Sequence, residues 1–244
     1  MTANRPERSA PSLARRRDRL LLVLAWSAGF VDAASFLGLG RVFTANMTGN
    51  TVFLGLALGR LDLAGALRSI AALAGFCLGV VTGAMIPAKV SQPMVWPRAV
   101  TITLMFECLA LTGLAFTWRY NGPAPEARTM AALIVLSGYA MGLQSAALKR
   151  IGVPAVGSTA VTGTVTGVMA GAVGWLHASS SGSAPHDEAR QAQSVFRLSA
   201  TVWFTYAFGA LAGGTGSASW HGAAILCPAV AVGLVTLIAL LSTG

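Results

Sequence analysis

The stretch LLLVLAWSAGFVDAASFLGLG, residues 20–40, is long enough and apolar enough to cross a lipid bilayer as a helix. A helical span needs roughly 20 residues to cross about 30 Å of hydrocarbon. Asp32 is the one acidic side chain in this stretch, and Glu107 is the one acidic side chain in the run 98–118. A carboxylate is costly in hydrocarbon, so it is retained where it faces a cavity, a partner or a transported ion. Both acids are therefore candidates for a functional site.

The composition predicts a polytopic membrane protein. Hydrophobic residues make up 55% of the chain and charged residues 10%, against roughly 25% charged residues in an ordinary soluble domain, and the mean hydropathy is +0.67. Backbone polar groups in lipid must be satisfied internally, which favours helices. The predicted spans are 20–40, 66–87, 98–118, 129–148, 196–214 and 222–241. We therefore expect an all-α transmembrane bundle that contacts the lipid bilayer and forms a single domain over residues 20–244.

Two further segments combine a polar half with an apolar half. Residues 41–60 and 155–177 begin with sequence rich in Thr, Asn and Gly and continue as apolar sequence. Each is either a full span or a break followed by a half-helix. If both cross, each half of the chain has four spans and the halves are parallel; if both turn back, each half has three spans and the halves are inverted. Basic residues do not decide this, because both topologies place twelve inside and five outside.

The basic residues cluster before the first span. Lys and Arg number 17 against 8 acidic residues, a formal net charge of +9. Six of them precede the first span, and the others lie in short loops, which is the positive-inside pattern with a cytoplasmic N-terminus. Residues 1–19 are therefore predicted to be a basic, disordered cytoplasmic tail that touches anionic lipid, and not a nucleic-acid-binding arm. The three cysteines lie in apolar runs without zinc-type spacing, so we expect no metal and no cofactor.

Short motifs recur between the two halves of the chain. The pairs are GFVDAA (29–34) with GLQSAA (142–147), Thr48-Gly49 with Thr162-Gly163, and Gly79-xxx-Gly83 with Gly209-xxx-Gly213. Their offsets are 113, 114 and 130, and the last increase fits the longer polar loop in the second half. Three matches in register predict a duplication, with repeat one over about 20–118 and repeat two over about 129–241.

The duplication predicts a central binding site. Many secondary transporters bind their substrate where two repeats meet, at broken and Gly-rich helices. The polar residues expected to line such a site, and to contact a small solute or ion, are Asp32, Asn46, Thr48, Asn50, Gln144, Ser145, Thr159 and Thr162. In the alternative interpretation the hydroxyls bond to their own helix backbone, and Asp32 caps a helix break or pairs with Arg41 or Lys149.

Glu107 and the glycine rows extend this prediction. The offset of 130 leads from Glu107 to Leu237, so Glu107 is expected either to be an asymmetric counter-charge in the site or to have no part in it. The glycines repeat every four residues in two rows, Gly75, Gly79, Gly83 and Gly163, Gly167, Gly171. Such rows allow close helix contact. We expect them to hold the bundle together, with a homo-oligomer interface as the alternative.

Three of these segments resemble a known family. GFVDAASFLGLGRVFTANMTGNTVFLGLALG (29–59), GLQSAALKRIG (142–152) and STAVTGTVTG (158–167) are similar to the YoaK-like family of bacterial integral membrane proteins, whose function is unassigned. The resemblance covers the chain from about Leu20 onward. It implies an all-helical fold in the bacterial inner membrane and supplies no substrate.

Three functions are consistent with these features. The first is a small secondary transporter or ion-coupled permease, with Asp32 as the ion or proton site. The second is a passive channel, which needs a polar pore and no titrating site. The third is a membrane scaffold or sensor that binds a partner through the basic tail or the loop 178–193. Enzyme motifs such as HExxH, GxSxG and a phosphate loop do not occur in the sequence, so we do not expect an enzyme.

Overall fold

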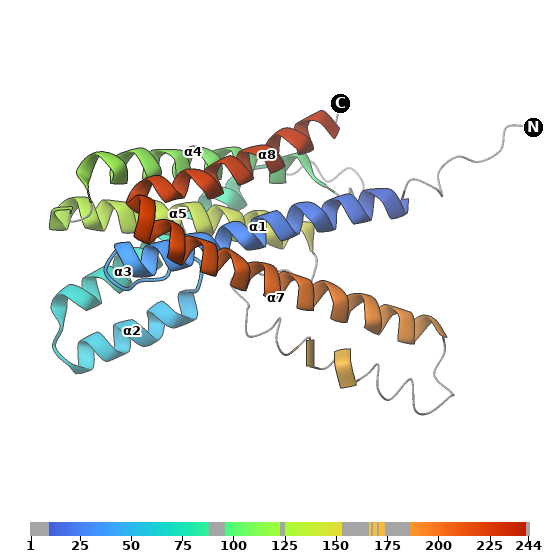
Figure 1. The fold of residues 1–244 in the computed structure, drawn as a ribbon, viewed down its shortest axis with the longest axis horizontal. Helices are drawn as coiled ribbons and strands as arrows, with labels where there is room; N and C mark the ends of the chain where they lie inside the picture. Colours follow the sequence, from blue (N-terminus) through green and yellow to red (C-terminus); the bar gives the residue numbers. More distant parts are fainter. Residues whose placement is uncertain are drawn as a thin grey trace, which may run out of the picture.

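The computed structural model describes residues 10–87, 96–122, 125–152 and 186–242, together with 166, 168, 169 and 171–173. All regular structure in these ranges is helical (Figure 1), which confirms the all-α prediction. The elements are α1 (Ala10–Gly38), α2 (Met47–Gly59), α3 (Leu63–Met85), α4 (Arg98–Asn121), α5 (Ala127–Ile151), α7 (His186–Trp220), the 3-10 turn η1 (His221–Ile225) and α8 (Leu226–Ser242).

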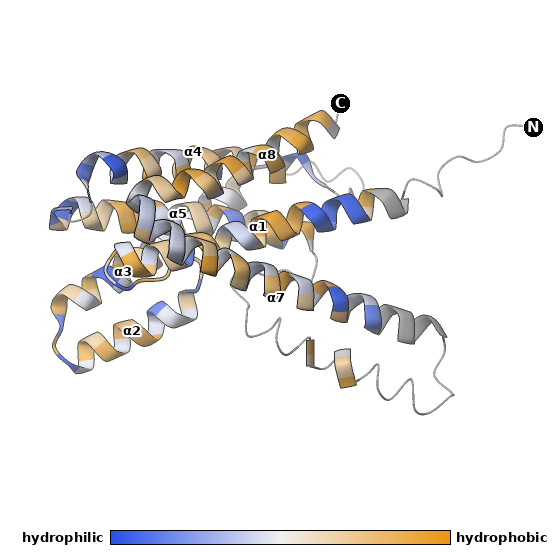
Figure 2. Ribbon diagram, viewed as in Figure 1, coloured by the Kyte–Doolittle hydropathy of each residue, from blue (hydrophilic) through white to orange (hydrophobic). Residues whose placement is uncertain are grey.

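Five helical segments in the described ranges are long and apolar enough to cross a membrane. They are Leu13–Gly38, Leu63–Met85, Arg98–Asn121, Ala127–Ile151 and Gly222–Leu241, and they coincide with five of the six predicted spans. The sixth, 196–214, lies inside α7, a continuous helix of 35 residues. Ser, Thr and Tyr side chains interrupt its apolar sequence. Figure 2 shows hydrophobic residues along the helices, with hydrophilic residues gathered at turns and at the start of α1.

The first helix begins ten residues earlier than predicted. The sequence predicts a disordered tail over 1–19 and a span from residue 20, whereas α1 starts at Ala10. Ala, Leu and Arg are strong helix formers, so the basic segment continues the apolar helix outward. Arg17 pairs with Asp18 at 2.8 Å, and the Nη2 atom of Arg16 donates to the carbonyl oxygen of Ile238 at 3.1 Å. The boundary at residue 20 is therefore corrected to Ala10.

The segment 41–60 is a break followed by a short helix. Residues 39–46 are irregular, and α2 has 13 residues, which is about 20 Å at 1.5 Å per residue and too short to span the hydrocarbon. Asn46 caps α2, because its side-chain oxygen accepts a hydrogen bond from the Gly49 backbone N–H at 3.3 Å. The corresponding segment 155–177 lies almost wholly outside the described residues.

The long helices alternate in direction. A Cβ atom at Gly38, the last residue of α1, would overlap the ring of Trp118 near the end of α4. Gly222, in the turn that follows α7, also lies against Trp118. The last turns of α1, α4 and α7 therefore lie at the same end of the bundle. The Arg16 contact joins the start of α1 to the end of α8, and Arg150 near the end of α5 donates to carbonyl oxygens at the end of α3. Helices α1, α4 and α7 therefore run one way, and α3, α5 and α8 run the other way (Figure 1).

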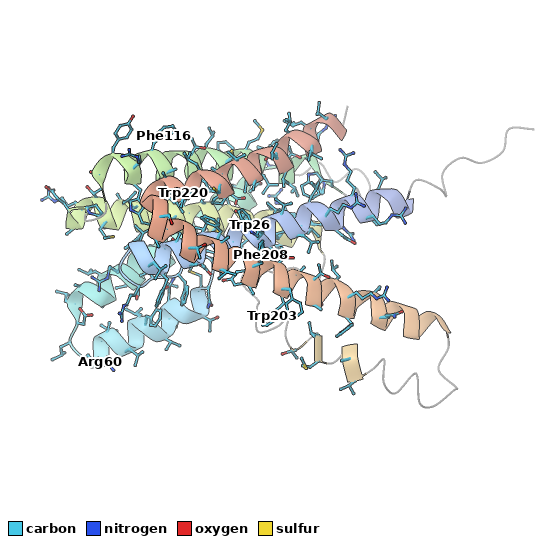
Figure 3. All side chains as sticks on the ribbon, viewed as in Figure 1. Trp26, Arg60, Phe116, Trp203, Phe208 and Trp220 are labelled. Carbon is cyan, nitrogen blue, oxygen red and sulfur yellow. The ribbon has the colours of Figure 1, made fainter. Side chains whose placement is uncertain are left out.

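Helices α1 and α7 cross at glycines. A Cβ atom at Gly29 would overlap the carbonyl oxygen of Tyr206, and a Cβ atom at Gly209 would overlap the carbonyl oxygen of Trp26. Figure 3 labels Trp26 and Phe208 in the region where the two helices meet. Side chains larger than hydrogen would force the two backbones apart, so these glycines are needed for the close approach.

Helices α3 and α5 cross in the same manner. A Cβ atom at Gly142 would overlap the carbonyl oxygen of Phe76, and one at Gly79 would overlap the carbonyl oxygen of Tyr139. Offsets of 113 and 130 relate these four residues to the four at the α1–α7 crossing. The first glycine row, Gly75, Gly79 and Gly83, thus packs against α5, as expected for a row that holds the bundle together.

The apolar core lies where α1, α4, α5 and the segment η1–α8 meet. Its fully buried large side chains include Leu21, Leu24, Leu104, Leu111, Leu114, Leu133, Ile134 and Ile225. Large apolar side chains also remain exposed on the outer faces, including Phe106, Phe208, Leu211, Leu234 and Leu241. An apolar exterior of this extent is typical of a protein surrounded by lipid.

Candidate functional site

Asp32 accepts three hydrogen bonds inside the bundle. Its Oδ1 atom accepts from the backbone N–H groups of Thr44 at 2.7 Å and Ala45 at 2.6 Å. Its Oδ2 atom accepts from the hydroxyl group of Tyr206 on α7 at 2.6 Å. The Asp32 residue is 2% exposed. The carboxylate therefore holds the irregular segment 39–46 against α1 and α7, with neither Arg41 nor Lys149 as its partner.

Three buried hydroxyl groups lie next to this carboxylate. The Oγ of Ser35 on α1 is 3.3 Å from the Oγ1 of Thr44 and 3.1 Å from the Oγ of Ser137 on α5. The Ser137 Oγ also donates to the Thr44 Oγ1 at 3.1 Å. Thr44 thus uses its backbone N–H on Asp32 and its hydroxyl in this triangle. The polar cluster of Asp32, Tyr206, Ser35, Thr44 and Ser137 joins α1, α5, α7 and the segment 39–46, and no salt bridge to it occurs among the described residues.

Asn50 supports the same irregular segment from α2. Its Oδ1 accepts from the Phe43 backbone N–H at 3.0 Å, and its Nδ2 donates to the Phe43 carbonyl oxygen at 2.5 Å. The Phe43 ring stacks on Phe36 and on Phe53, with ring centroids 5.1 Å and 5.7 Å apart. Asn46 caps α2. The two Asn residues of the predicted site therefore satisfy the backbone on either side of Met47.

The remaining predicted residues lie apart from the Asp32 carboxylate. Gln144 is buried, and its Nε2 donates to the Leu24 carbonyl oxygen of α1 at 2.7 Å, while its Oε1 has no partner. Ser145 is half-buried and Thr48 is exposed. Thr159 and Thr162 lie outside the described residues. The three hydrogen bonds described above come from Thr44, Ala45 and Tyr206, which are not in the predicted set, while the backbone of Asn46, which is in that set, also interacts with the carboxylate.

Glu107 is a separate buried acid on α4. It is fully buried, and neither carboxylate oxygen has a hydrogen-bond partner among the described residues. An isolated buried carboxylate in its charged form costs several kcal/mol. The next residue, Cys108, donates from its thiol to the Ala229 carbonyl oxygen of α8 at 3.4 Å, so Glu107 lies on the α4 helix near its contact with α8 and does not join the Asp32 cluster by a hydrogen bond.

Sequence reasoning missed Tyr206, Thr44 and Ser137. Tyr206 lies in the predicted span 196–214, where a phenol hydroxyl is polar enough to need a partner. Ser35 lies three residues after Asp32, on the same helix face, and was a usable signal. The contact of Thr44 with Asp32 depends on how the irregular segment folds back, which no local pattern encodes.

The cluster has the chemistry of an anion held by fixed donors. Two backbone N–H groups and a phenol hydroxyl group donate to this carboxylate. Among the described residues, no group of three or more His, Cys, Asp or Glu side chains is placed to hold a metal. A proton on Oδ1 of Asp32 would face two backbone N–H donors and displace at least one of them, whereas a proton on Oδ2 could be donated to the Tyr206 hydroxyl oxygen and reverse that bond. The carboxylate is therefore coupled to the position of the segment 39–46.

Comparison with known proteins identifies the family. A family model described as "Protein of unknown function (DUF1275)" matches residues 20–238. The chain is also 39% identical, over 153 residues, to the "UPF0700 transmembrane protein YoaK" of Bacillus subtilis (strain 168). That alignment covers 63% of this chain and 66% of the relative, just under two thirds of the relative's length. No solved structure matches. The chain belongs to the DUF1275 family and is similar to a YoaK transmembrane protein, as the sequence motifs predict.

Proposed function

We propose that this protein is an ion-coupled permease of a small solute, located in the bacterial inner membrane, with Asp32 as the coupling site. The observation that carries the proposal is the set of three hydrogen bonds that Asp32 accepts from Thr44, Ala45 and Tyr206. A buried acid at membrane depth is expensive and typical of ion and proton pathways. Here it also holds a broken segment in place, so its charge and the local conformation are linked.

The coupling step follows from the hydrogen-bond inventory of a carboxyl group. The ionised form accepts all three bonds, whereas a proton on Oδ1 cannot face the two backbone N–H groups and a proton on Oδ2 reverses the bond to the Tyr206 hydroxyl group. In either case the negative charge is lost and the two backbone bonds that hold the segment 39–46 become weaker. The same segment continues into α2, so a change at Asp32 reaches the short helix directly. A proton gradient can drive such a cycle only if the solute binds the two arrangements differently.

We further infer that the two halves are inverted repeats. The α1–α7 and α3–α5 crossings have matching glycine contacts at offsets of 113 and 130, and the matched helices run in opposite directions. Inverted repeats with broken helices are frequent in secondary transporters. With six crossing helices, the loops opposite the N-terminus hold five of the 17 basic residues, which favours a cytoplasmic N-terminus.

Transport assays with the purified full-length protein in liposomes test the proposal. Currents are recorded on a solid-supported membrane for a panel of small carboxylates, inorganic phosphate, amino acids, sugars and monovalent cations, with and without a pH gradient. We expect at least one solute to give a current that the gradient increases, and Asp32→Asn to abolish that increase. Thr82→Ala, which removes an exposed hydroxyl group that donates to the Leu78 carbonyl oxygen of its own helix, serves as the control.

The outcomes separate the permease from the other two functions. Transport that ignores pH and sodium gradients, and is equal in the wild type and in Asp32→Asn, would identify a passive channel. A scaffold or sensor would give no current with any solute in the panel, and its phenotype would be lost when the basic tail is deleted and kept in Asp32→Asn. Either result contradicts a coupling role for Asp32.

A further inference from the structure

A cavity of about 290 Å³ lies between the irregular segment after α1, α2 and α3. Three of its lining residues are arginines, Arg41, Arg60 and Arg68, and Asp62 is the single acid. Figure 3 labels Arg60 at the turn between α2 and α3. The cavity thus concentrates three of the five basic residues that the chain places at this end of the bundle.

The arginines that line this cavity form no salt bridge with the residues that the structure describes. Asp62 caps α3, since its Oδ1 accepts from the Gly65 backbone N–H at 2.9 Å. The single ion pair in the described ranges joins Arg17 and Asp18, far along the sequence from these arginines. The Nε of Arg68 is buried and has no hydrogen-bond partner. Leaving a buried donor without a partner costs about 1–3 kcal/mol. The position of this unpaired N–H group at the cavity therefore calls for an explanation.

The backbone around the cavity is strained in a way that positions the arginines. Arg41 has φ 64° and Leu61, next to Arg60, has φ 57°, and these are the non-glycine residues with positive φ in the described chain. Such conformations cost of order 1–3 kcal/mol each. Gly40 has φ 77°, and a Cβ atom there would lie 2.6 Å from the Cδ of Arg68. The glycine therefore provides the space that the Arg68 side chain occupies.

We propose that this cavity binds a small oxyanion, a carboxylate or phosphate group, through Arg41, Arg60 and Arg68. Guanidinium groups present paired N–H donors that match the two oxygens of a carboxylate or phosphate. Phe36 and Phe53 supply apolar walls for an organic remainder. The volume is at the lower end of the range for ligand pockets, which restricts the ligand to a few heavy atoms or to a lipid headgroup at the cavity mouth.

An oxyanion ligand would extend the proposed permease function by naming its substrate class. Binding of the anion can be tested without measuring transport. As the substrate class of the permease it rests on that proposal, because binding of an anion does not by itself establish transport. As a binding site it rests on the cavity alone. Residues 40–42 line the cavity, and the same irregular segment reaches Asp32 through Thr44 and Ala45. Occupancy by an anion and the state of Asp32 would therefore act on one segment.

Binding is measured on the full-length protein in nanodiscs of phosphatidylcholine at low ionic strength. The probes are inorganic phosphate and succinate, with chloride at equal ionic strength as the reference, and the readout is the midpoint of thermal unfolding across a titration. We expect phosphate, succinate or both to raise the midpoint in a saturable manner. Arg68→Gln is expected to raise the apparent Kd at least about ten-fold, the size expected for one charge-assisted hydrogen bond.

Matched variants separate loss of the site from loss of the fold. Arg41→Gly removes a charge from the cavity and places glycine where φ is positive, so it is expected to fold at least as well as the wild type and to bind the anion more weakly. Arg119→Gln removes the same charge from an exposed position at the same end of the bundle. This control is expected to leave the apparent Kd within about two-fold, because Arg119 does not line the cavity and a distant exposed charge is screened.

A second arm distinguishes a free anion from a lipid headgroup. Stabilisation by phosphatidylglycerol nanodiscs that is lost in Arg68→Gln and in Arg41→Gly, with no response to soluble anions, would assign the site to a lipid phosphate. Saturable, arginine-dependent binding of a soluble anion without any coupled current would keep the site and reject the permease. The inference is overturned if no probe stabilises the protein, or if the cavity variants and Arg119→Gln respond alike.

Discussion

The α1–α7 and α3–α5 crossings share their packing and differ in their chemistry. In both, glycines allow each backbone to touch a carbonyl oxygen of its partner helix. At the α1–α7 crossing, Asp32 accepts a hydrogen bond from Tyr206. The aligned positions at the other crossing hold Ser145 and Phe76. Close approach needs only the absence of a side chain, whereas a buried charge needs several donors aimed at one point.

The largest expected effect is confined to the acidic crossing. Asp32→Ala removes the acceptor for two backbone N–H groups and one hydroxyl group, each costing about 1–3 kcal/mol when left unmet. We expect the free energy of unfolding to fall by about 3–5 kcal/mol, measured by SDS-induced unfolding in mixed micelles. Ser145→Ala at the aligned position is expected to change it by less than about 0.5 kcal/mol. Equal losses in both variants would contradict the difference between the crossings.

Substitution of the crossing glycines is expected to lower the free energy of unfolding by the same amount at both crossings. Gly209→Ala and Gly79→Ala each put a Cβ atom against a backbone carbonyl oxygen, and overpacking of this kind costs typically 1–3 kcal/mol. We expect both variants to lose about 2 kcal/mol in the same unfolding assay. Gly55→Ala has open space around it and is the matched control. Tolerance of one substitution and not the other would show that the two crossings are not equivalent in packing.

Tyr206 tests the polar difference on its own. Tyr206→Phe keeps the ring and removes one of the three donors to Asp32. Interhelical hydrogen bonds in membrane proteins contribute about 0.6 kcal/mol on average and rarely more than about 1.7 kcal/mol. We expect a loss of about 1 kcal/mol, which should disappear when the same substitution is made in an Asp32→Ala background. A full, additive loss in the double variant would mean that the hydroxyl acts elsewhere.

The smallest change in the free energy of unfolding is expected for Gln144, which joins α5 to α1 between the two crossings. Gln144→Leu removes one hydrogen bond to the Leu24 carbonyl oxygen and also removes the buried Oε1 that has no partner. These two changes oppose each other, so we expect unfolding to shift by less than about 0.5 kcal/mol. A loss above about 2 kcal/mol would show that Gln144 fixes α5 on α1 more firmly than its contacts indicate.

The sequence predicts the helices well because their determinants are local. Length and hydropathy place four spans within a few residues of the helices found and miss the start of α1 by ten residues. The errors follow from the same reliance on apolar runs. The strong helix formers before Leu20 extend α1 to Ala10, and α7 extends beyond the predicted span 196–214 at both ends, from His186 to Trp220.

The site was harder to predict because its contacts are long-range. Asp32 stands out in the sequence by its cost in hydrocarbon, but the N–H groups that satisfy it belong to residues 44 and 45, whose positions depend on how the chain folds back before α2. In the sequence, each arginine of the cavity looks like an ordinary loop residue. Arg41 and Arg68 line one cavity, and the Arg68 side chain occupies space that Gly40 leaves open.

The two glycine crossings divide the long helices at the centre of the bundle into two units, α1 with α7 and α3 with α5. Between these units, Ser35 meets Ser137 through hydroxyl groups, and Gln144 meets the Leu24 carbonyl oxygen. Hydroxyl and amide groups can exchange partners by rotating, whereas backbones in contact at glycine cannot slide without a clash. Any rocking of the molecule is therefore expected along this seam, with each helix pair moving as a rigid body.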